Sequence, residues 1–165
     1  MKNRSINILI ASLCLLGIMA VILVVAVEKA HSNFDKNIMV SSNGVTETTL
    51  AVRDLKLNPA DKKEYSVNLV CEASGSYDIF LTYDETHDGG MKHFVNVKVF
   101  ADEKNVYSGS LTDLLDKGTT VEFEGTLEAK KPLVVTIRYE MPYEIGNEAQ
   151  GTSTDFDVTL KVVKN

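Results

Sequence analysis

The chain has 165 residues, with 17 basic and 23 acidic side chains, a formal net charge of -6, two cysteines and no tryptophan. This length suits one ordinary domain with a terminal appendage. Only Lys2 and Arg4 are charged before Glu28, so the chain after Val27 has 15 basic against 23 acidic side chains, a net charge of -8. Such acidity argues against binding to nucleic acid, because neutralising phosphates requires clustered Lys and Arg.

The first predicted element is a run of 22 residues without a charge, Ile6 to Val27. About 20 residues of helix cross a bilayer core, and a helix satisfies its own backbone hydrogen bonds in lipid. Because the basic residues Lys2 and Arg4 precede the run, residues 1–5 are expected in the cytoplasm and the chain after Glu28 outside the cell. The sequence therefore predicts a single-pass protein of the plasma membrane, held there by Ile6 to Val27.

A cleaved signal peptide is the alternative reading of the same run. Its apolar core usually has roughly 7 to 15 residues and ends in a small-x-small site, for which Val24-Val25-Ala26 is acceptable. The run here is longer than that, which favours an uncleaved signal anchor. The secreted form remains the alternative.

Residues 28–44 lack sustained periodicity and end in Ser-Ser-Asn-Gly, which predicts a stalk before an extracellular domain over residues 45–165. In that domain, apolar residues recur at every second position in runs rich in Val, Ile, Tyr, Phe and Thr. This pattern is typical of antiparallel strands with one exposed face. The runs cover residues 65–69, 77–83, 95–99, 121–124, 135–139 and 156–162.

Turn-forming residues separate these runs, for example Asn58-Pro59, Asp88-Gly89-Gly90 and Gly146-Asn147. Seven to nine short strands without a long helical pattern predict an all-β fold, an antiparallel β-sandwich of jelly-roll or immunoglobulin-like type. The one helical turn expected outside the membrane segment is Ser110 to Leu115, in which Ser110 can cap the helix.

Cys71 follows Leu69 and Val70 in a strand pattern and is expected to be a buried thiol. Cys14 lies in the predicted membrane helix, so the two sulfur atoms are not expected to meet in a disulfide.

Several stretches of the domain resemble one known family. Leu55 to Asp61 is similar to a Pro-Gly-Asp turn before a strand, with Ala60 in place of the glycine, and Tyr107 to Leu111 is similar to a Tyr-x-Gly-x-Leu segment. Met141-Pro142 and Gly146 to Gly151 look like the loop before a last strand, here Phe156 to Val163. The arrangement resembles the TasA/camelysin-type surface proteins of Gram-positive bacteria. The resemblance implies a jelly-roll sandwich at the cell surface, in relatives that form biofilm-matrix fibres or stay wall-associated.

The densest group of metal-type ligands lies between Tyr83 and His93. A hairpin at Asp88-Gly89-Gly90 would gather carboxylates and imidazoles that suit a divalent metal ion. An acidic hairpin tip that only keeps the protein soluble explains the same residues. The candidate ligands are Asp84, Glu85, His87, Asp88 and His93.

A second candidate site is the segment from Met141 to Gly151, because binding residues collect on loops held by a rigid sandwich. A long connection between two strands is the plain alternative. The candidate recognition residues are Tyr143, Asn147, Glu148 and Gln150.

Motifs for catalysis do not occur: there is no H-E-x-x-H zinc motif, no G-x-S-x-G elbow and no P-loop. We therefore expect no enzyme and no cofactor, but a structural or interaction role whose partners are other surface or matrix proteins. The alternatives are a secreted TasA-like matrix or fibre subunit formed after signal cleavage, and a divergent camelysin-type metallopeptidase that uses the Asp84 to His93 group.

Overall fold

The computed structural model describes residues 36–41 and 44–165. The predicted cytoplasmic tail (residues 1–5), the membrane segment Ile6 to Val27 and the first part of the predicted stalk lie outside the described residues. Within the described ranges, no helix is long and apolar enough to cross a bilayer.

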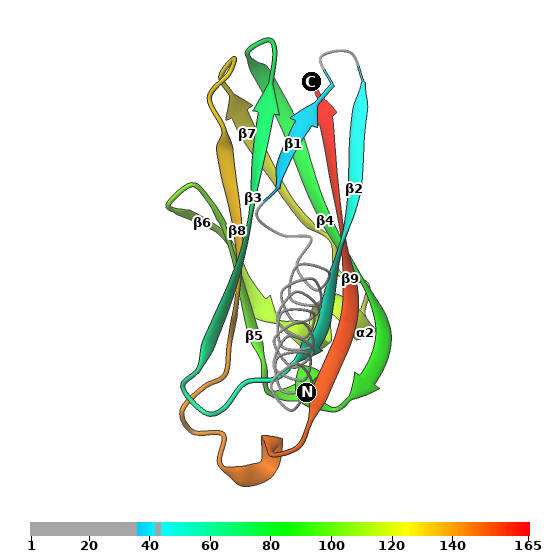
Figure 1. Ribbon diagram of the computed structural model, residues 1–165, viewed down its shortest axis with the longest axis vertical. Coiled ribbons are helices and arrows are strands. Elements are labelled where there is room, and N and C mark those ends of the chain that lie inside the picture. Colours follow the sequence, from blue (N-terminus) through cyan, green and yellow to red (C-terminus); the bar gives the residue numbers. More distant parts are fainter. Residues whose placement is uncertain (1–35, 42–43) are drawn as a thin grey trace, which may run out of the picture. The chain divides into compact units, whose positions relative to one another are not determined.

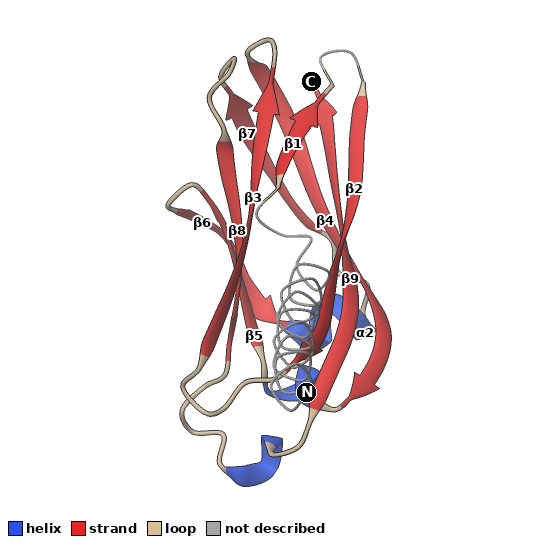
Figure 2. Ribbon diagram, in the orientation of Figure 1, coloured by secondary structure: helices blue, strands red, loops and turns tan. Residues whose placement is uncertain are grey.

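The described residues form two facing sheets (Figures 1 and 2). One sheet has five strands in the order β1-β3-β8-β5-β6, and the other has four in the order β2-β9-β4-β7. The strands are β1 (Asn37–Val40), β2 (Val45–Leu55), β3 (Lys62–Cys71), β4 (Gly75–Gly89), β5 (Asn96–Ala101), β6 (Lys104–Ser110), β7 (Val121–Leu127), β8 (Leu133–Glu140) and β9 (Ser153–Lys164). The predicted β-sandwich is confirmed.

Each connection between consecutive strands crosses from one sheet to the other, except the β5–β6 hairpin. This interleaving of β2 to β9 corresponds to the jelly-roll type among the two predicted alternatives. It brings β4 and β9, which are far apart in the sequence, side by side in the centre of the four-stranded sheet.

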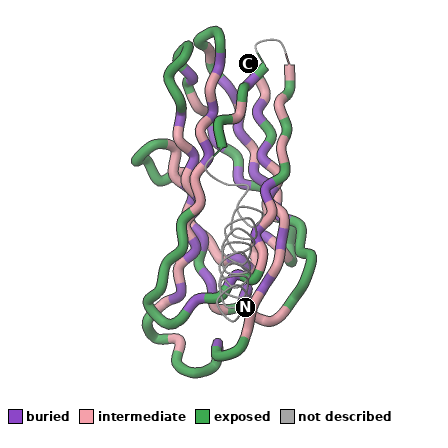
Figure 3. The backbone as a smooth tube through the Cα atoms, viewed as in Figure 1, coloured by how far each residue is buried: buried purple, intermediate pink, exposed green. Residues whose placement is uncertain are grey.

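The inward residues of the predicted runs form one core between the sheets (Figure 3). Tyr77, Ile79 and Leu81 of β4 are fully buried, and the alternate residues of β8 and β9 are buried as well. Cys71 is buried among them, as predicted. Alternation works as a predictor here because successive side chains of a strand point to opposite faces.

Two features differ from the sequence prediction. β1 lies inside the segment that was predicted to be a stalk, and it pairs with β3 in parallel, with Asn37 opposite Asn68 and Val40 opposite Cys71. The physical reason is burial, since Val40 is buried in the core and Ile38 packs against it. The sandwich therefore includes residues from Asn37 onward, and its strand pairs are not all antiparallel.

The predicted helical turn is confirmed as α2 (Leu111–Asp116). The Ser110 side chain accepts a hydrogen bond from the backbone N–H of Asp113, which satisfies one free donor of the first turn. Leu111 and Leu114 are fully buried, so the apolar face of this short helix joins the core. Two 3-10 turns complete the described structure, η1 (Met91–Phe94) and η2 (Asn147–Ala149).

Candidate functional site

Both candidate sites of the sequence lie at one end of the sandwich, which we call the loop end. Backbone hydrogen bonds tie its connections together: the N–H of Ala60 donates to the carbonyl of Met141 (3.1 Å), and the N–H of Met141 donates to the carbonyl of Asp61 (3.0 Å). The loop end comprises the connections at residues 56–61, 90–95, 111–120 and 141–152, together with the final residues of β4, 84–89.

A buried lysine organises the first half of the loop end. The Lys92 side chain is only 7% exposed, and its Nζ lies 2.8 Å from Glu85 Oε2, 2.8 Å from Asp116 Oδ1 and 3.0 Å from Asp88 Oδ2. We call these four residues the Lys92 network. It joins β4, η1 and α2.

The backbone of Lys92 is held as firmly as its side chain. Its N–H donates to Oγ1 of Thr154, which is fully buried, and its carbonyl accepts a hydrogen bond from Thr112 Oγ1. A buried charge is tolerated only with such pairing, because removing it from water is costly.

The network keeps Lys92 and Asp88 charged. Hydrogen bonds to Asp116 and Glu85 raise the pKa of Lys92 well above its ordinary value, against the effect of burial. The pKa of Asp88 is lowered, first by the backbone N–H of Gly90 and then by Lys92. An ammonium that stays protonated at neutral pH serves neither as a nucleophile nor as a general base.

The predicted hairpin at Asp88-Gly89-Gly90 is wrong, because β4 and the next strand, β5, lie in different sheets. β4 continues through Asp84, Glu85, His87 and Asp88 to Gly89, because β9 offers a partner along the whole stretch, up to Gly89 opposite Ser153. The turn follows at Gly90, which has φ 89°. A bulge between Glu85 and His87 interrupts the alternation of this part of the strand.

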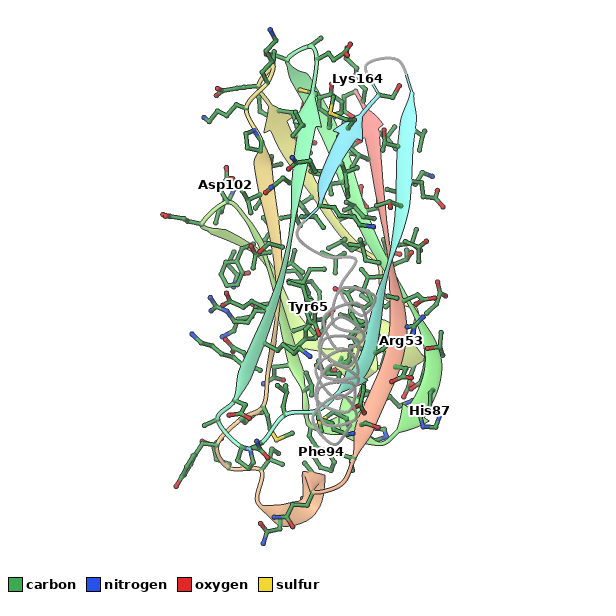
Figure 4. All side chains as sticks on the ribbon, viewed as in Figure 1. Arg53, Tyr65, His87, Phe94, Asp102 and Lys164 are labelled. Atoms are coloured by element: carbon green, nitrogen blue, oxygen red, sulfur yellow. The ribbon has the colours of Figure 1, made fainter. Side chains whose placement is uncertain are left out.

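The structure divides the five predicted metal ligands. Glu85 and Asp88 meet around Lys92, whereas Asp84 lies opposite Asp157 and His87 opposite Asp155 across the β4–β9 pair. His87 projects from the outer side of the sheet in Figure 4. The Nδ1 atom of His93 lies 3.4 Å from Thr112 Oγ1. In the described part of the chain, no group of three or more His, Cys, Asp or Glu side chains is arranged to hold a metal ion.

A pocket of about 390 Å³ occupies the other half of the loop end. It is lined by residues 56–59, by Met91 and by the 146–152 segment without Glu148. Leu57, Met91 and Ala149 are buried and supply an apolar surface, while the amide side chains of Asn58 and Asn147 are exposed beside it. Among the described residues that line the pocket, Lys56 alone is ionisable, so the pocket holds no acid and base pair.

The predicted recognition loop contributes part of this pocket. Asn147 and Gln150 line it, and the Nε2 atom of Gln150 donates to Oδ1 of Asn147 (3.0 Å). Glu148 is exposed outside the lining, and Tyr143 is 80% exposed on the same connection. Thr152 closes the turn, since its hydroxyl donates to the carbonyl of Ala149 (2.7 Å).

The sequence did not point to the other components of the loop end. Asp116 lies 24 residues from Lys92, and no local pattern connects them. Leu57 and Asn58 were predicted only as the start of a turn, although they form one wall of the pocket. The turn pair Asn58-Pro59 could have indicated this wall of the pocket, since turns that follow a strand often carry binding residues.

The chain was compared with known proteins. No family model matches it, and no curated protein matches it. The solved structures that are similar include the pre-peptidase C-terminal domain of a collagenase from Bacillus anthracis, with 10% identity over 76% of this chain and 92% of that one and a TM-score of 0.33. They also include a family 35 carbohydrate binding module from Clostridium thermocellum (12% identity, 73% and 92% of the chains, TM-score 0.36). A third is the CUB1-EGF-CUB2 domain of human MASP-1/3 (13% identity, 74% and 43%, TM-score 0.41). At these scores the similarities support no functional inference.

Proposed function

We propose that this chain is a non-catalytic binding domain that contacts another protein at the cell surface through its loop end. The observation that carries the proposal is the pocket between residues 56–59 and 146–152, whose described lining includes apolar and amide side chains but no acid-base pair. Functional residues collect on loops that a rigid scaffold positions, and here the Lys92 network and the backbone bonds of Met141 make the scaffold rigid.

A peptidase role has less support from the same residues. The Lys92 ammonium occupies the space between Glu85 and Asp88, where a metal ion of the predicted cluster would have to lie. Catalytic zinc needs three protein ligands and an open position, and the described residues do not assemble such a set.

Site-specific photo-crosslinking in cells tests the binding role. A photoreactive phenylalanine analogue at Tyr143, on the loop end, is expected to form a discrete adduct with one partner protein. The same analogue at Glu103, in the β5–β6 hairpin outside the loop end, is the control. Equal adducts at both positions, or none at Tyr143, would contradict the proposal.

Membrane anchoring is a separate part of the proposal. It is supported by the 22 uncharged residues of Ile6 to Val27 and by Lys2 and Arg4 before them. The intact chain is expected in the membrane fraction, with its C-terminal domain digested by protease added to whole cells. A mature protein that starts beyond Ala26 and is found in the medium would contradict anchoring.

A matrix or fibre subunit of the TasA-like kind is the second candidate function. The observation that favours it is β1, a strand of four residues that is added in parallel at a sheet edge and follows directly on the N-terminal segment. A strand held by so few pairs is open to replacement by the same strand of another copy, provided that the N-terminus is freed by cleavage. Electron microscopy of the processed chain that shows monomers under all conditions would exclude this role.

A further inference from the structure

We infer that the partner presents a basic, extended segment to the loop end and inserts one aliphatic side chain into the pocket. This inference rests on the proposed binding role and adds the chemistry of the partner. It is carried by three properties of the loop end: the apolar part of the pocket, the free amide groups beside it, and the excess of negative charge around it.

The apolar part of the pocket suits a single side chain. Leu57, Met91 and Ala149 are each less than 10% exposed, so the apolar part of the lining is largely shielded from bulk water. The pocket volume of about 390 Å³ is at the lower end of the range for ligand pockets, roughly 300 to 1,000 Å³. A pocket of this size can hold one side chain with a short stretch of peptide backbone. None of the described residues that line the pocket is aromatic, so its described wall lacks the flat surface on which sugar rings stack.

The amide groups suit the backbone of an extended peptide. Asn147 accepts one hydrogen bond from Gln150, and Asn58 donates one to Asp61. The amide nitrogen of Asn147 and the amide oxygens of Asn58 and Gln150 make no further hydrogen bond to described residues. A carboxamide both donates and accepts, which matches the alternating N–H and C=O groups of a strand-like segment.

The surrounding charge favours a basic segment. Three carboxylates share the single positive charge of Lys92, which leaves this network with two negative charges in excess. Glu144 and Glu148, on the connection that forms the pocket wall, are exposed and make no ion pair with described residues. Lys56 is the one cation among the described lining residues, and it forms an ion pair with Asp54. Charge of one sign around a pocket selects partners of the opposite sign.

Methyl NMR of the full chain in detergent micelles tests the inference, with methionine methyl groups labelled. The probes are the peptides Gly-Lys-Gly-Leu-Gly-Lys-Gly, its alanine-centred analogue, and an analogue with Glu in place of both Lys. The leucine peptide is expected to shift the Met91 signal and to leave Met39 unchanged, since Met39 is 58% exposed on β1, away from the pocket. The alanine analogue is expected to bind at least about tenfold more weakly, because three fewer carbon atoms enter the pocket. The glutamate analogue is expected to leave Met91 unchanged.

Two charge-reversal variants form a matched pair. Glu144→Lys with Glu148→Lys changes the charge of the loop end, whereas Glu72→Lys with Glu103→Lys makes the same change on connections outside it. We expect the first variant to bind the leucine peptide at least tenfold more weakly than the wild type, and the second to change the affinity for this peptide less than threefold. Equal effects, a Met39 shift as large as that of Met91, or binding of the glutamate analogue would overturn the inference.

The same experiment separates this inference from the proposed function. If crosslinking from Tyr143 succeeds but no peptide shifts Met91, the binding role stands and the peptide chemistry is wrong. If an N-acetylglucosamine trimer shifts Met91 and the peptides do not, the pocket recognises sugar, which also overturns the inference. If neither crosslinks nor shifts are found, both fail.

Discussion

Replacing Lys92 by Met removes the ammonium group from the loop end and keeps most of the length of the side chain. The three carboxylates within 2.8 to 3.0 Å of Nζ then lose their shared cation and repel one another. Because β4, η1 and α2 each supply a member of the Lys92 network, we expect the substitution to lower the stability of the domain.

The size of the expected stability loss follows from how deeply the members of the Lys92 network are buried. Removing one partner of a fully buried ion pair costs about 3 to 5 kcal/mol. Lys92 meets this condition, but the carboxylates of Glu85, Asp88 and Asp116 are 25%, 43% and 41% exposed, so water screens part of their repulsion. We therefore expect a loss of about 2 to 3 kcal/mol at pH 7.

Urea denaturation of the full chain measures this loss, and Lys98→Met is the matched control. Lys98 also pairs with a carboxylate, that of Glu140, but its side chain is 37% exposed. An exposed pair is worth about 0 to 1 kcal/mol, so the control should lose no more than that. A Lys92 variant as stable as the Lys98 variant would refute the reasoning.

The loss should depend on pH in a stated direction. The lowered pKa of Asp88 contributes stability above the ordinary value of about 3.9, and this contribution disappears as the pH falls through the lower pKa of the folded state. The raised pKa of Lys92 contributes stability below about 10.4, and this contribution disappears as the pH rises through the higher folded value. The variant should therefore differ most from the wild type between about pH 5 and pH 9. An unchanged difference at pH 2 would contradict this.

Three further substitutions test other features. Ala60 has φ 70°, a left-handed conformation that costs an L residue roughly 1 kcal/mol, so Ala60→Gly should raise the urea midpoint, and an unchanged or lower midpoint would contradict this. A Cβ atom at Gly89 would clash with the Ser153 carbonyl oxygen of β9, so Gly89→Ala should lower the free energy of unfolding by about 1 to 3 kcal/mol, measured by thermal unfolding. An unchanged melting temperature would contradict this, because it would show that β4 and β9 move apart at little cost. The Tyr139 hydroxyl is buried without a hydrogen-bond partner among the described residues, so Tyr139→Phe should leave the stability unchanged or raise it by up to about 1 kcal/mol. A loss of stability of more than about 1 kcal/mol would contradict this and would reveal a water bound to the hydroxyl.

Local sequence patterns predicted most of the sandwich. Alternation located the buried faces of β4, β8 and β9, because a strand places every second side chain on the same side. Ser110 predicted the start of α2, because a cap depends only on residues two or three positions away. Asn147 and Gln150 were predicted as binding residues from their place in the connection between two strands, and both line the pocket.

Local patterns failed where a long-range partner determines the conformation. Asp88-Gly89-Gly90 has the composition of a hairpin tip, yet β9 extends the pairing of β4 to Gly89. β1 was missed because its four residues show no sustained alternation, and its place depends on the edge of β3 that it covers.

The sequence by itself was sufficient to predict the acidic charge of the domain, the two-sheet β fold and the burial of Cys71, because these properties follow from composition and from periodicity along the chain. It was not sufficient for the two halves of the loop end. Lys92 looks like an ordinary surface lysine until α2 brings Asp116 to its ammonium group, and Leu57 becomes part of a pocket only when the 146–152 segment lies opposite it. Both arrangements join residues that are distant in the chain, and only the crossing of strands between the two sheets brings such residues together.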